Sequence, residues 1–350
     1  MASIFYKNKP IIGLDISKTS LRVMSVDMNK MLVHGYGSIE LDPAKTADET
    51  DEGAEYLRSK MNELFNKHII GKLSSDRVVL GIPTARTYAR TFSLPAEQES
   101  NIKDAVNLET EQYIPMPLST LYVDYQIIKR TKKELTVLTC AVPQKIIDDT
   151  IMTARQCGLD VAMIEPGMNA VARLLERTGE GGVPMIVVDI GPASTDIAIL
   201  DGGIRVTGGL NIGGNTLTLD IAKKLNIPLE TAHQLKVLNG LSAGPRQEKI
   251  TAALTPSLSR ITNEVQKVLR YYADRFPDES TIKQAVIVGS GSSIPSLGDF
   301  FTSELGIPSR LAIPWQAINF GNLVPPTKQL RPRFMTAAGL ALVRPEEIWL

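Results

Sequence analysis

The chain has few of the residues from which disulfide frameworks and metal centres are made. Its 350 residues include only two cysteines and three histidines. The cysteines, Cys140 and Cys157, stand too far apart for a Cys-x-x-Cys site, and the histidines lack the short spacing of metal ligands. We therefore expect both cysteines to be free, buried thiols in a reducing compartment.

An excess of charge of one sign is also missing. Lys plus Arg number 38, as do Asp plus Glu, so the formal net charge at pH 7 is zero. Such a chain lacks the positive field that draws proteins onto nucleic acid or an acidic membrane. No apolar run reaches the length of a membrane-spanning helix, and residues 1–10 do not resemble a signal peptide. We expect a cytoplasmic protein with no nucleic acid partner and no insertion in a membrane.

What the sequence does contain is an alternation of apolar strands and amphipathic helices, which predicts an α/β fold. A chain of 350 residues exceeds what one core usually supports, so two domains are expected. Strands are predicted at 11–16, 21–27, 31–41, 77–82, 87–94, 121–128, 134–142, 185–190, 194–200 and 284–289. Helices are predicted at 48–67, 97–113, 144–157, 167–176, 217–225, 232–237, 255–276 and 335–343, with Pro256 in the first turn of its helix.

The first segment with chemical meaning is a strand that ends in a polar turn. Asp15 stands at the mouth of this turn, which contains Ser17, Lys18, Thr19 and Ser20. Backbone N–H groups and hydroxyls in such a turn can face phosphate oxygens, while the carboxylate holds the water shell of Mg²⁺. A polar hairpin turn is common, so this segment alone is a weak indication.

The same design returns in the second half of the chain. There a strand delivers Asp189 to a turn that contains Gly191, Ser194 and Thr195. Two carboxylates at the ends of two equivalent hairpins can face each other across a cleft, which suits a magnesium triphosphate. Pro192 removes one backbone N–H from the second turn.

A third segment follows a buried strand near residue 288. It consists of Gly289, Ser290, Gly291 and Ser292, small residues that let the backbone approach a flat base or a ribose closely. An ordinary turn between a strand and a helix would have the same composition.

The order of these three segments resembles that of the actin/Hsp70/hexokinase superfamily, with two phosphate motifs followed by an adenosine motif. The resemblance implies an actin/Hsp70-like two-domain fold that binds ATP and Mg²⁺, with Asp15 and Asp189 next to the metal. It implies that Glu165, which precedes a connecting helix, is the catalytic residue that positions Mg²⁺ and the attacking water. It also implies further adenosine contacts from Gly213, Gly214, Asn215 and Lys236.

The block between residues 77 and 160 indicates a branch of the superfamily, because it is placed as in FtsA and in the type IV pilus assembly protein PilM family. Within it, Leu108–Leu118 followed by Val123–Tyr125 resembles a PilM signature. The resemblance implies an inserted FtsA/PilM-type subdomain at 77–160. It further implies a first actin-like subdomain at 1–76, completed by 161–184 and 319–350, and a second actin-like domain at 185–318.

For function, the resemblance implies an ATP-binding scaffold of the pilus assembly platform, held at the inner membrane through its partners. The chief expected partner is the cytoplasmic tail of a PilN-like protein, and pilus motor ATPases are further candidates. The tail is expected in a groove between the inserted subdomain and its neighbour. The candidate contact residues are Tyr113, Ile114, Pro115 and Pro117.

Two departures from the superfamily pattern bear on catalysis. Ser17 stands where many relatives have glycine, and Pro192 cannot donate to phosphate. We therefore expect ATP hydrolysis to be slow or absent.

One alternative is an FtsA-like membrane-associated filament protein, although residues 344–350 are too short and acidic for a basic amphipathic helix. Another is a small-molecule kinase, which would need a general base beside an acceptor pocket.

Overall fold

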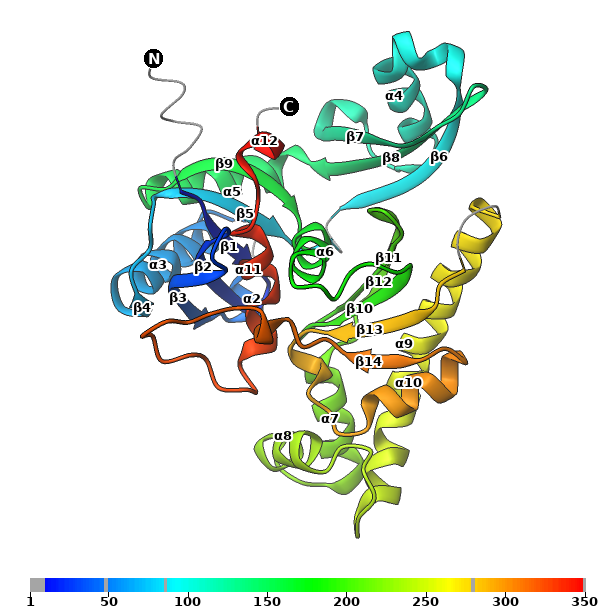
Figure 1. The fold of residues 1–350 in the computed structure, drawn as a ribbon. Helices are drawn as coiled ribbons and strands as arrows, with labels where there is room; N and C mark the ends of the chain where they lie inside the picture. The colour runs from blue at the N-terminus through cyan, green and yellow to red at the C-terminus, as the bar shows by residue number, and fades with distance from the viewer. Residues whose placement is uncertain (1–9, 47–49, 85–86, 278–280, 349–350) are drawn as a thin grey trace.

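The structure, a computed structural model, describes residues 10–46, 50–84, 87–277 and 281–348. Within these ranges the strands form one sheet of six, one of five and one of three (Figure 1). We call the six-stranded sheet with its helices the first lobe and the five-stranded sheet with its helices the second lobe. The three-stranded sheet with its helix is called the inserted sheet.

The first lobe is built on a mixed sheet. Across it run β4 (Ile69–Gly71), β3 (Leu32–Glu40), β2 (Ser20–Asp27), β1 (Ile12–Ile16), β5 (Arg77–Ile82) and β9 (Asp160–Pro166). Strand β1 is antiparallel to β2 and parallel to β5. One face packs against α3 (Asp51–Lys67) and α5 (Gln144–Gln156), and this core includes Leu14, Leu80 and Met61. The short helix α2 (Pro43–Thr46) precedes α3.

The second lobe repeats the plan. Its sheet contains β12 (Ile204–Leu210), β11 (Thr195–Leu200), β10 (Met185–Ile190), β13 (Gln284–Val288) and β14 (Ser309–Leu311), in that order. Strand β10 is antiparallel to β11 and parallel to β13, as β1 is to β2 and β5. The outer face is covered by α7 (Gly214–Leu225), α9 (Gln247–Arg275) and α10 (Leu297–Leu305), with α8 (Leu229–Leu238) beside α7.

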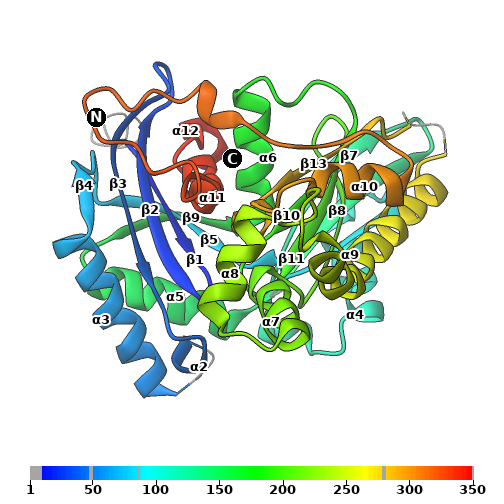
Figure 2. The same cartoon turned by 90° about the horizontal axis from the view of Figure 1, so that it is seen from below.

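Two helices lie between the two lobes and join their cores (Figure 2). They are α6 (Gly167–Arg177) and α11 (Met335–Leu340). Their apolar residues share one buried cluster with Met24 of the first sheet and with Val187 and Val286 of the second. Helix α11 lies so close to β1 that a Cβ atom on Gly13 would be 2.2 Å from the carbonyl oxygen of Ala337. This close approach requires glycine at position 13.

The inserted sheet stands apart from these layers, at the top right of Figure 1. Its strands, in order, are β6 (Tyr88–Pro95), β8 (Glu134–Pro143) and β7 (Leu121–Arg130), all antiparallel. Helix α4 (Ile102–Tyr113) packs on one face around Phe92, Val106 and Val137. The chain enters it from β5 and leaves it into α5. The C-terminal helix α12 (Pro345–Ile348) follows α11.

The structure corrects the predicted boundaries of the inserted subdomain. Strand β5 pairs with β1 and β9, and α5 packs against α3, so both elements belong to the first lobe. The separate sheet therefore covers residues 88–143 and is narrower than the predicted block 77–160. A short apolar run such as Arg77–Ile82 indicates a buried strand, but it does not reveal which sheet the strand joins.

Most predicted elements are confirmed, and the strands at 77–82 and 185–190 agree at both ends. The long helix α9 is the main exception, because it begins at Gln247 and Pro256 lies inside it. The turns before the proline are helical because Ile250, Ala253 and Leu254 are buried in the core of the second lobe. Positions 48 and 49 of the predicted helix 48–67 lie outside the described residues.

Other small differences concern helix ends and the cysteines. The predicted helix 97–113 begins as a 3₁₀ turn over Ala96–Asn101, and the predicted helix 335–343 ends at Leu340. Both cysteines are free, as predicted, but they are half-buried rather than buried. None of the described helices has the length and apolar composition needed to cross a membrane.

Candidate nucleotide-binding site

The two lobes enclose a narrow cleft with a volume of about 90 Å³. The turns of the β1–β2 and β10–β11 hairpins reach it from opposite sides. The residues that line it include Asp15, Ser17 and Arg22 from the first hairpin and Asp189, Gly191, Pro192, Ser194 and Asp196 from the second. The structure therefore brings the two predicted phosphate segments together.

The two hairpins match in register. Asp15 of β1 lies opposite Arg22 of β2, and Asp189 of β10 lies opposite Asp196 of β11. The cross-strand neighbour is thus a cation in one hairpin and a second carboxylate in the other. The Nη1 atom of Arg22 donates to Oδ2 of Asp15 at 3.3 Å.

Burial gives this carboxylate cluster unusual protonation behaviour. It raises the pKa of Asp189 to about 7, and the charge of Asp15 adds to the effect. The pKa of Asp196 is likewise raised to about 7, by burial and then by Asp189 and Asp15. Burial also raises the pKa of Asp15, although Arg22 opposes this rise.

Several buried polar atoms of the cluster have no hydrogen-bond partner among the described residues. They are Oδ1 of Asp196 and the Nε and Nη2 atoms of Arg22. Buried polar groups are normally hydrogen-bonded, because leaving one without a partner costs about 1–3 kcal/mol. A free acceptor and two free donors in one cleft fit a ligand that combines a cation with anionic oxygens.

The first turn reaches the cleft with fewer residues than predicted. The Oγ atom of Ser17 accepts hydrogen bonds from the backbone N–H groups of Thr19 and Ser20, so the turn is already ordered. Thr19 and Ser20 are buried, and the exposed Lys18 lies in a groove on the other side of the turn. Of the predicted phosphate contacts in this turn, only Asp15 and Ser17 line the cleft.

The second turn also divides its predicted residues between two roles. Gly191 and Ser194 line the cleft. Thr195 is fully buried and its hydroxyl donates to the carbonyl oxygen of Ile212 at 2.7 Å, so it holds the turn against the chain that leads into α7.

The predicted adenosine segments pack against the second turn. The N–H groups of Gly214 and Asn215 donate to the carbonyl oxygens of Gly191 and Pro192, both at 2.9 Å. A Cβ atom on Gly213 would lie 2.6 Å from the oxygen of Gly191, so the two backbones touch. These three residues meet the second turn without lining the cleft itself.

The last predicted segment closes one end of the cleft. Gly289 and Ser290 line it, whereas Gly291 and Ser292 are buried. Gly289 has φ +86°, and a Cβ atom there would lie 2.1 Å from Oδ1 of Asp189. Both the conformation and the space require glycine at this position.

Lys236 is buried beside these segments. Its Nζ atom donates to the carbonyl oxygen of Gly214 and to the hydroxyl of Thr218, both at 2.7 Å. Burial, and then the charge of Arg333, lowers the pKa of Lys236 to about 8. No carboxylate within the described ranges forms an ion pair with it. A buried amine of this kind can bind a hydroxyl or an anionic oxygen nearby.

Glu165 lies away from the cleft. It is buried on β9, and its two carboxylate oxygens accept hydrogen bonds from Arg173 at 2.6 and 2.9 Å. Arg173 also donates to the carbonyl oxygen of Gly339 and to Glu347. The pair therefore ties β9 and α6 to the C-terminal segment, and Glu165 is not among the residues that line the cleft.

The prediction from the sequence missed three charged residues of the cleft. They are Arg22, Asp196 and Arg333. Two of them could have been found by counting, because a hairpin with a tight turn fixes which residues are opposite Asp15 and Asp189. Arg333 comes from the segment before α11, whose position depends on tertiary packing.

Among the described residues, no group of three or more His, Cys, Asp or Glu side chains is arranged to hold a metal ion. A divalent ion here would need phosphate oxygens or water to complete its ligands. The carboxylates of Asp15 and Asp189 fit such an ion as partial or water-mediated ligands.

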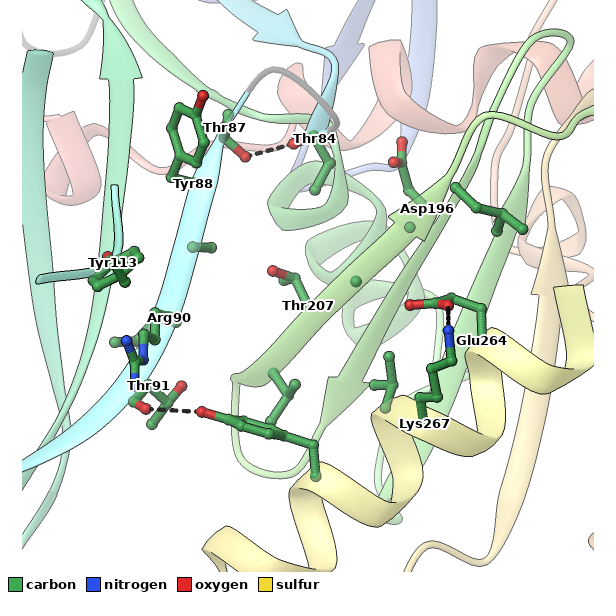
Figure 3. Close-up of a pocket in the computed structure, with 18 of the residues that line it drawn as sticks. Thr84, Thr87, Tyr88, Arg90, Thr91, Tyr113, Asp196, Thr207, Glu264 and Lys267 are labelled. Atoms are coloured by element: carbon green, nitrogen blue, oxygen red, sulfur yellow. Dashed lines mark hydrogen bonds and ion pairs between the residues drawn. The ribbon is translucent and has the colours of Figure 1, made fainter. Parts of the chain in front are cut away.

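The inserted sheet borders two grooves. One, of about 680 Å³, lies between β6 and the second lobe and contains Tyr113, whose ring centre is 4.8 Å from the Arg90 guanidinium (Figure 3). The other, of about 420 Å³, lies between α3, α5 and Met116. Of the remaining predicted contact residues, Ile114 is buried in a small core, whereas Pro115 and Pro117 are exposed on either side of Met116.

The family model described as "Type IV pilus assembly protein PilM" matches residues 13–345. The chain belongs to this family. The resemblance inferred from the inserted block is thereby confirmed.

Solved structures confirm the actin-like fold of this PilM family member. The chain is 23% identical to a chain of a PilM-PilN type IV pilus biogenesis complex, over 96% of this chain and 98% of that one, with a TM-score of 0.79. It is 18% identical to the ethanolamine utilization protein EutJ from Carboxydothermus hydrogenoformans, over 95% and 88%, with a TM-score of 0.55. MreB 5 of Spiroplasma citri bound to AMPPNP is 16% identical, over 87% and 92%, with a TM-score of 0.51.

Curated relatives of this PilM family member include cell division proteins FtsA. The protein from Neisseria meningitidis is 29% identical over 53% of this chain and 48% of its own length. The protein from Pseudomonas aeruginosa is 26% identical over 73% of this chain and 63% of its own length. The chain thus spans about half the length of the first curated relatives it matches.

Proposed function

We propose that this chain binds ATP with Mg²⁺ in the cleft between the two lobes and acts as a scaffold of a type IV pilus assembly platform. The observation that carries the proposal is the matched register of Asp15 and Asp189 at the ends of two equivalent hairpins. The partnerless atoms of Arg22 and Asp196 support it, because phosphate oxygens and a cation would supply their missing partners.

In this proposal each segment has one role. Ser17, Gly191 and Ser194 contact phosphate oxygens, and Asp15 and Asp189 hold the Mg²⁺ ion directly or through water. The ion neutralises charge on the phosphates. The base and ribose lie towards Gly289, Ser290 and the buried amine of Lys236, with the segments at 213–215 and 291–292 as the supporting wall.

The cleft must widen to take the nucleotide. Its volume of about 90 Å³ is well below the several hundred Å³ typical of small-molecule sites. The two lobes share α6 and α11 as a common layer, so small movements at this layer can separate the two hairpins. If the nucleotide binds only when the cleft opens, nucleotide binding can switch the scaffold between a closed and an open state.

Rapid catalysis is not part of the proposal. Glu165 is fully engaged by Arg173, and Pro192 lacks an N–H at the second turn. We expect one ATP bound per chain and a steady-state hydrolysis rate below about 1 s⁻¹, the lower end of ordinary turnover. Equilibrium dialysis with labelled ATP, together with a phosphate-release assay, tests both parts. Tight binding with a rate well above that limit would contradict the scaffold role.

The proposed partner is the cytoplasmic tail of a PilN-like membrane protein. We place it in the groove between α3, α5 and the turn at Ile114–Pro117. Two prolines fix this turn, so Met116 is presented to an extended peptide with little ordering cost. Binding of such a tail would hold the chain at the inner membrane, and pilus motor ATPases are further candidate partners.

A further inference from the structure

The larger groove beside the inserted sheet is bounded by two strand edges. On one side is β6 and on the other is β12. Among the described strands, β6 pairs only with β8 and β12 only with β11. An edge strand carries backbone N–H and C=O groups that no neighbouring strand uses. Figure 3 shows Tyr88, Arg90 and Thr91 of β6 across the groove from Thr207 of β12.

The two edges touch at one end of the groove and diverge towards the other. At the closed end the hydroxyl of Thr91 donates to the carbonyl oxygen of Arg205, and the hydroxyl of Tyr271 donates to the carbonyl oxygen of Thr91. At the open end the groove reaches Thr84 and Asp196, which also line the nucleotide cleft. The space between has a volume of about 680 Å³.

This shape suits an extended chain. Five residues of β12, Val206–Leu210, line the groove, which at ~3.3 Å per residue corresponds to roughly 16 Å. Apolar side chains of Leu138, Val206 and Val268 also line it.

The charge at the end of the groove near Leu210, which we call the outer end, selects the kind of peptide. A second hollow of about 470 Å³ shares Leu210, Glu264 and Lys267 with the groove and is lined by Arg260 and Arg270. The cationic side chains of Arg260, Lys267 and Arg270 are all exposed on α9. Within the described ranges Lys267 pairs with Glu264, whereas Arg260 and Arg270 form no ion pair. The outer end therefore carries an excess of positive charge.

We propose that this groove binds an extended, acidic peptide segment of a partner protein, which adds as a strand between β6 and β12 with its acidic end on α9. Backbone hydrogen bonds to the strand edges provide affinity, and the cations at 260, 267 and 270 provide direction and selectivity. The site is separate from the groove proposed for the PilN-like tail, because the two share no lining residue. It does not depend on the proposed nucleotide.

A library of random peptides of about twelve residues, longer than the ~5 residues that fit along β12, is the probe. It is displayed on phage and selected on the full chain. We expect enrichment of sequences with β-branched residues followed by Asp or Glu. For the best synthetic peptide, the triple variant Arg260→Glu, Lys267→Glu, Arg270→Glu should weaken binding by about tenfold or more.

The matched control reverses the same number of charges elsewhere, with Lys223→Glu, Lys224→Glu and Lys249→Glu, three exposed lysines outside the groove. It should bind the peptide as the parent does. Methylation of the backbone nitrogens at either set of alternate peptide positions should weaken binding, because a strand between two neighbours donates alternate N–H groups to each of them.

Three results would overturn the proposal. The library could yield no specific peptide. The selected peptides could bind the triple variant and the control equally, or tolerate methylation at every position, which would exclude strand addition on this face. Light scattering could show that the parent self-associates and that the triple variant does not, which would make the groove a contact between copies of this chain.

Discussion

At the scale of single residues, the centre of the molecule is a group of buried acids around one arginine. Asp189 and Asp196 are directly opposite on one hairpin, and Asp15 faces them with Arg22. Ionising all of these neighbouring buried carboxylates at once costs free energy, because like charges repel and burial disfavours the charged form. The electrostatic repulsion within this cluster therefore destabilises the folded protein unless a metal cation is bound there.

Because of this repulsion, the free energy of unfolding should fall as the pH rises. The pKa values of Asp189 and Asp196 are raised to about 7, well above the unfolded value near 4. The folded state therefore binds more protons than the unfolded state between about pH 4 and 7, and these two groups make stability fall as pH rises through that window.

Asp196→Asn should remove much of this fall. In nucleotide-free and metal-free buffer, the variant should exceed the parent in free energy of unfolding at pH 8, by an amount on the order of a few kcal/mol, and approach it at pH 5. Urea unfolding at several pH values measures the difference, with Asp104→Asn, an exposed acid, as the control. Parallel curves for parent and variant would show that Asp196 does not titrate in this way.

The Glu165–Arg173 pair gives a second prediction at this scale. Glu165→Ala leaves the guanidinium of Arg173 without its bidentate partner in a buried position, which should lower the free energy of unfolding by about 3–5 kcal/mol. The double variant Glu165→Leu, Arg173→Met should recover much of this loss, because it leaves no unpaired charge. Urea denaturation checks both. If Glu165→Ala unfolds like the parent but loses ATP hydrolysis, Glu165 acts in catalysis and our account of this residue is wrong.

At the scale of elements, the inserted sheet is the part that distinguishes this chain from a plain pair of lobes. It extends from the first lobe between β5 and α5 and borders one groove on each side. Of the candidate contact residues only Tyr113 lines a groove, that of the second lobe, whereas the neighbouring Met116 lines the groove of the first lobe.

We predict that Met152→Asp weakens binding of a synthetic PilN-like tail peptide by at least about tenfold, or ~1.4 kcal/mol. Met152 lies in the groove of the first lobe and is half exposed, so the substitution should not disturb folding. Fluorescence anisotropy of the labelled peptide measures the change. Leu108→Asp, at an exposed apolar residue of α4 outside both grooves, is the control.

Tyr113→Ala separates the two grooves. If the tail binds where we place it, this variant should keep its affinity, because Tyr113 lines the groove of the second lobe and not that of the first. Loss of binding in Tyr113→Ala with normal binding in Met152→Asp would move the tail to the groove of the second lobe.

At the scale of the whole molecule, local patterns predicted some of the residues that line the cleft between the two lobes, but not all of them. Asp15, Asp189 and Gly289 were found because a strand followed by a polar or glycine-rich turn is a pattern of neighbouring residues. Lys18 and Glu165 do not line the cleft. The carboxylate of Glu165 is held instead by Arg173, which lies on another element.

The same limit applies to the architecture. The run at Arg77–Ile82 was predicted as a strand, but its pairing with β1 and β9 follows from topology that no short segment encodes. The start of α9 was missed because proline is favoured in the first turn of a helix, whereas burial of Ile250 and Leu254 outweighs that preference here.

The account rests on ATP binding between the two lobes, and thermal unfolding with Mg-ATP tests it most directly. The measurement uses protein verified by mass to carry no nucleotide. At about 100 times the dissociation constant, Mg-ATP should add roughly 2.7 kcal/mol to the free energy of unfolding, and Asp189→Asn should reduce this gain. A melting curve of the parent that does not change with millimolar Mg-ATP would contradict the account.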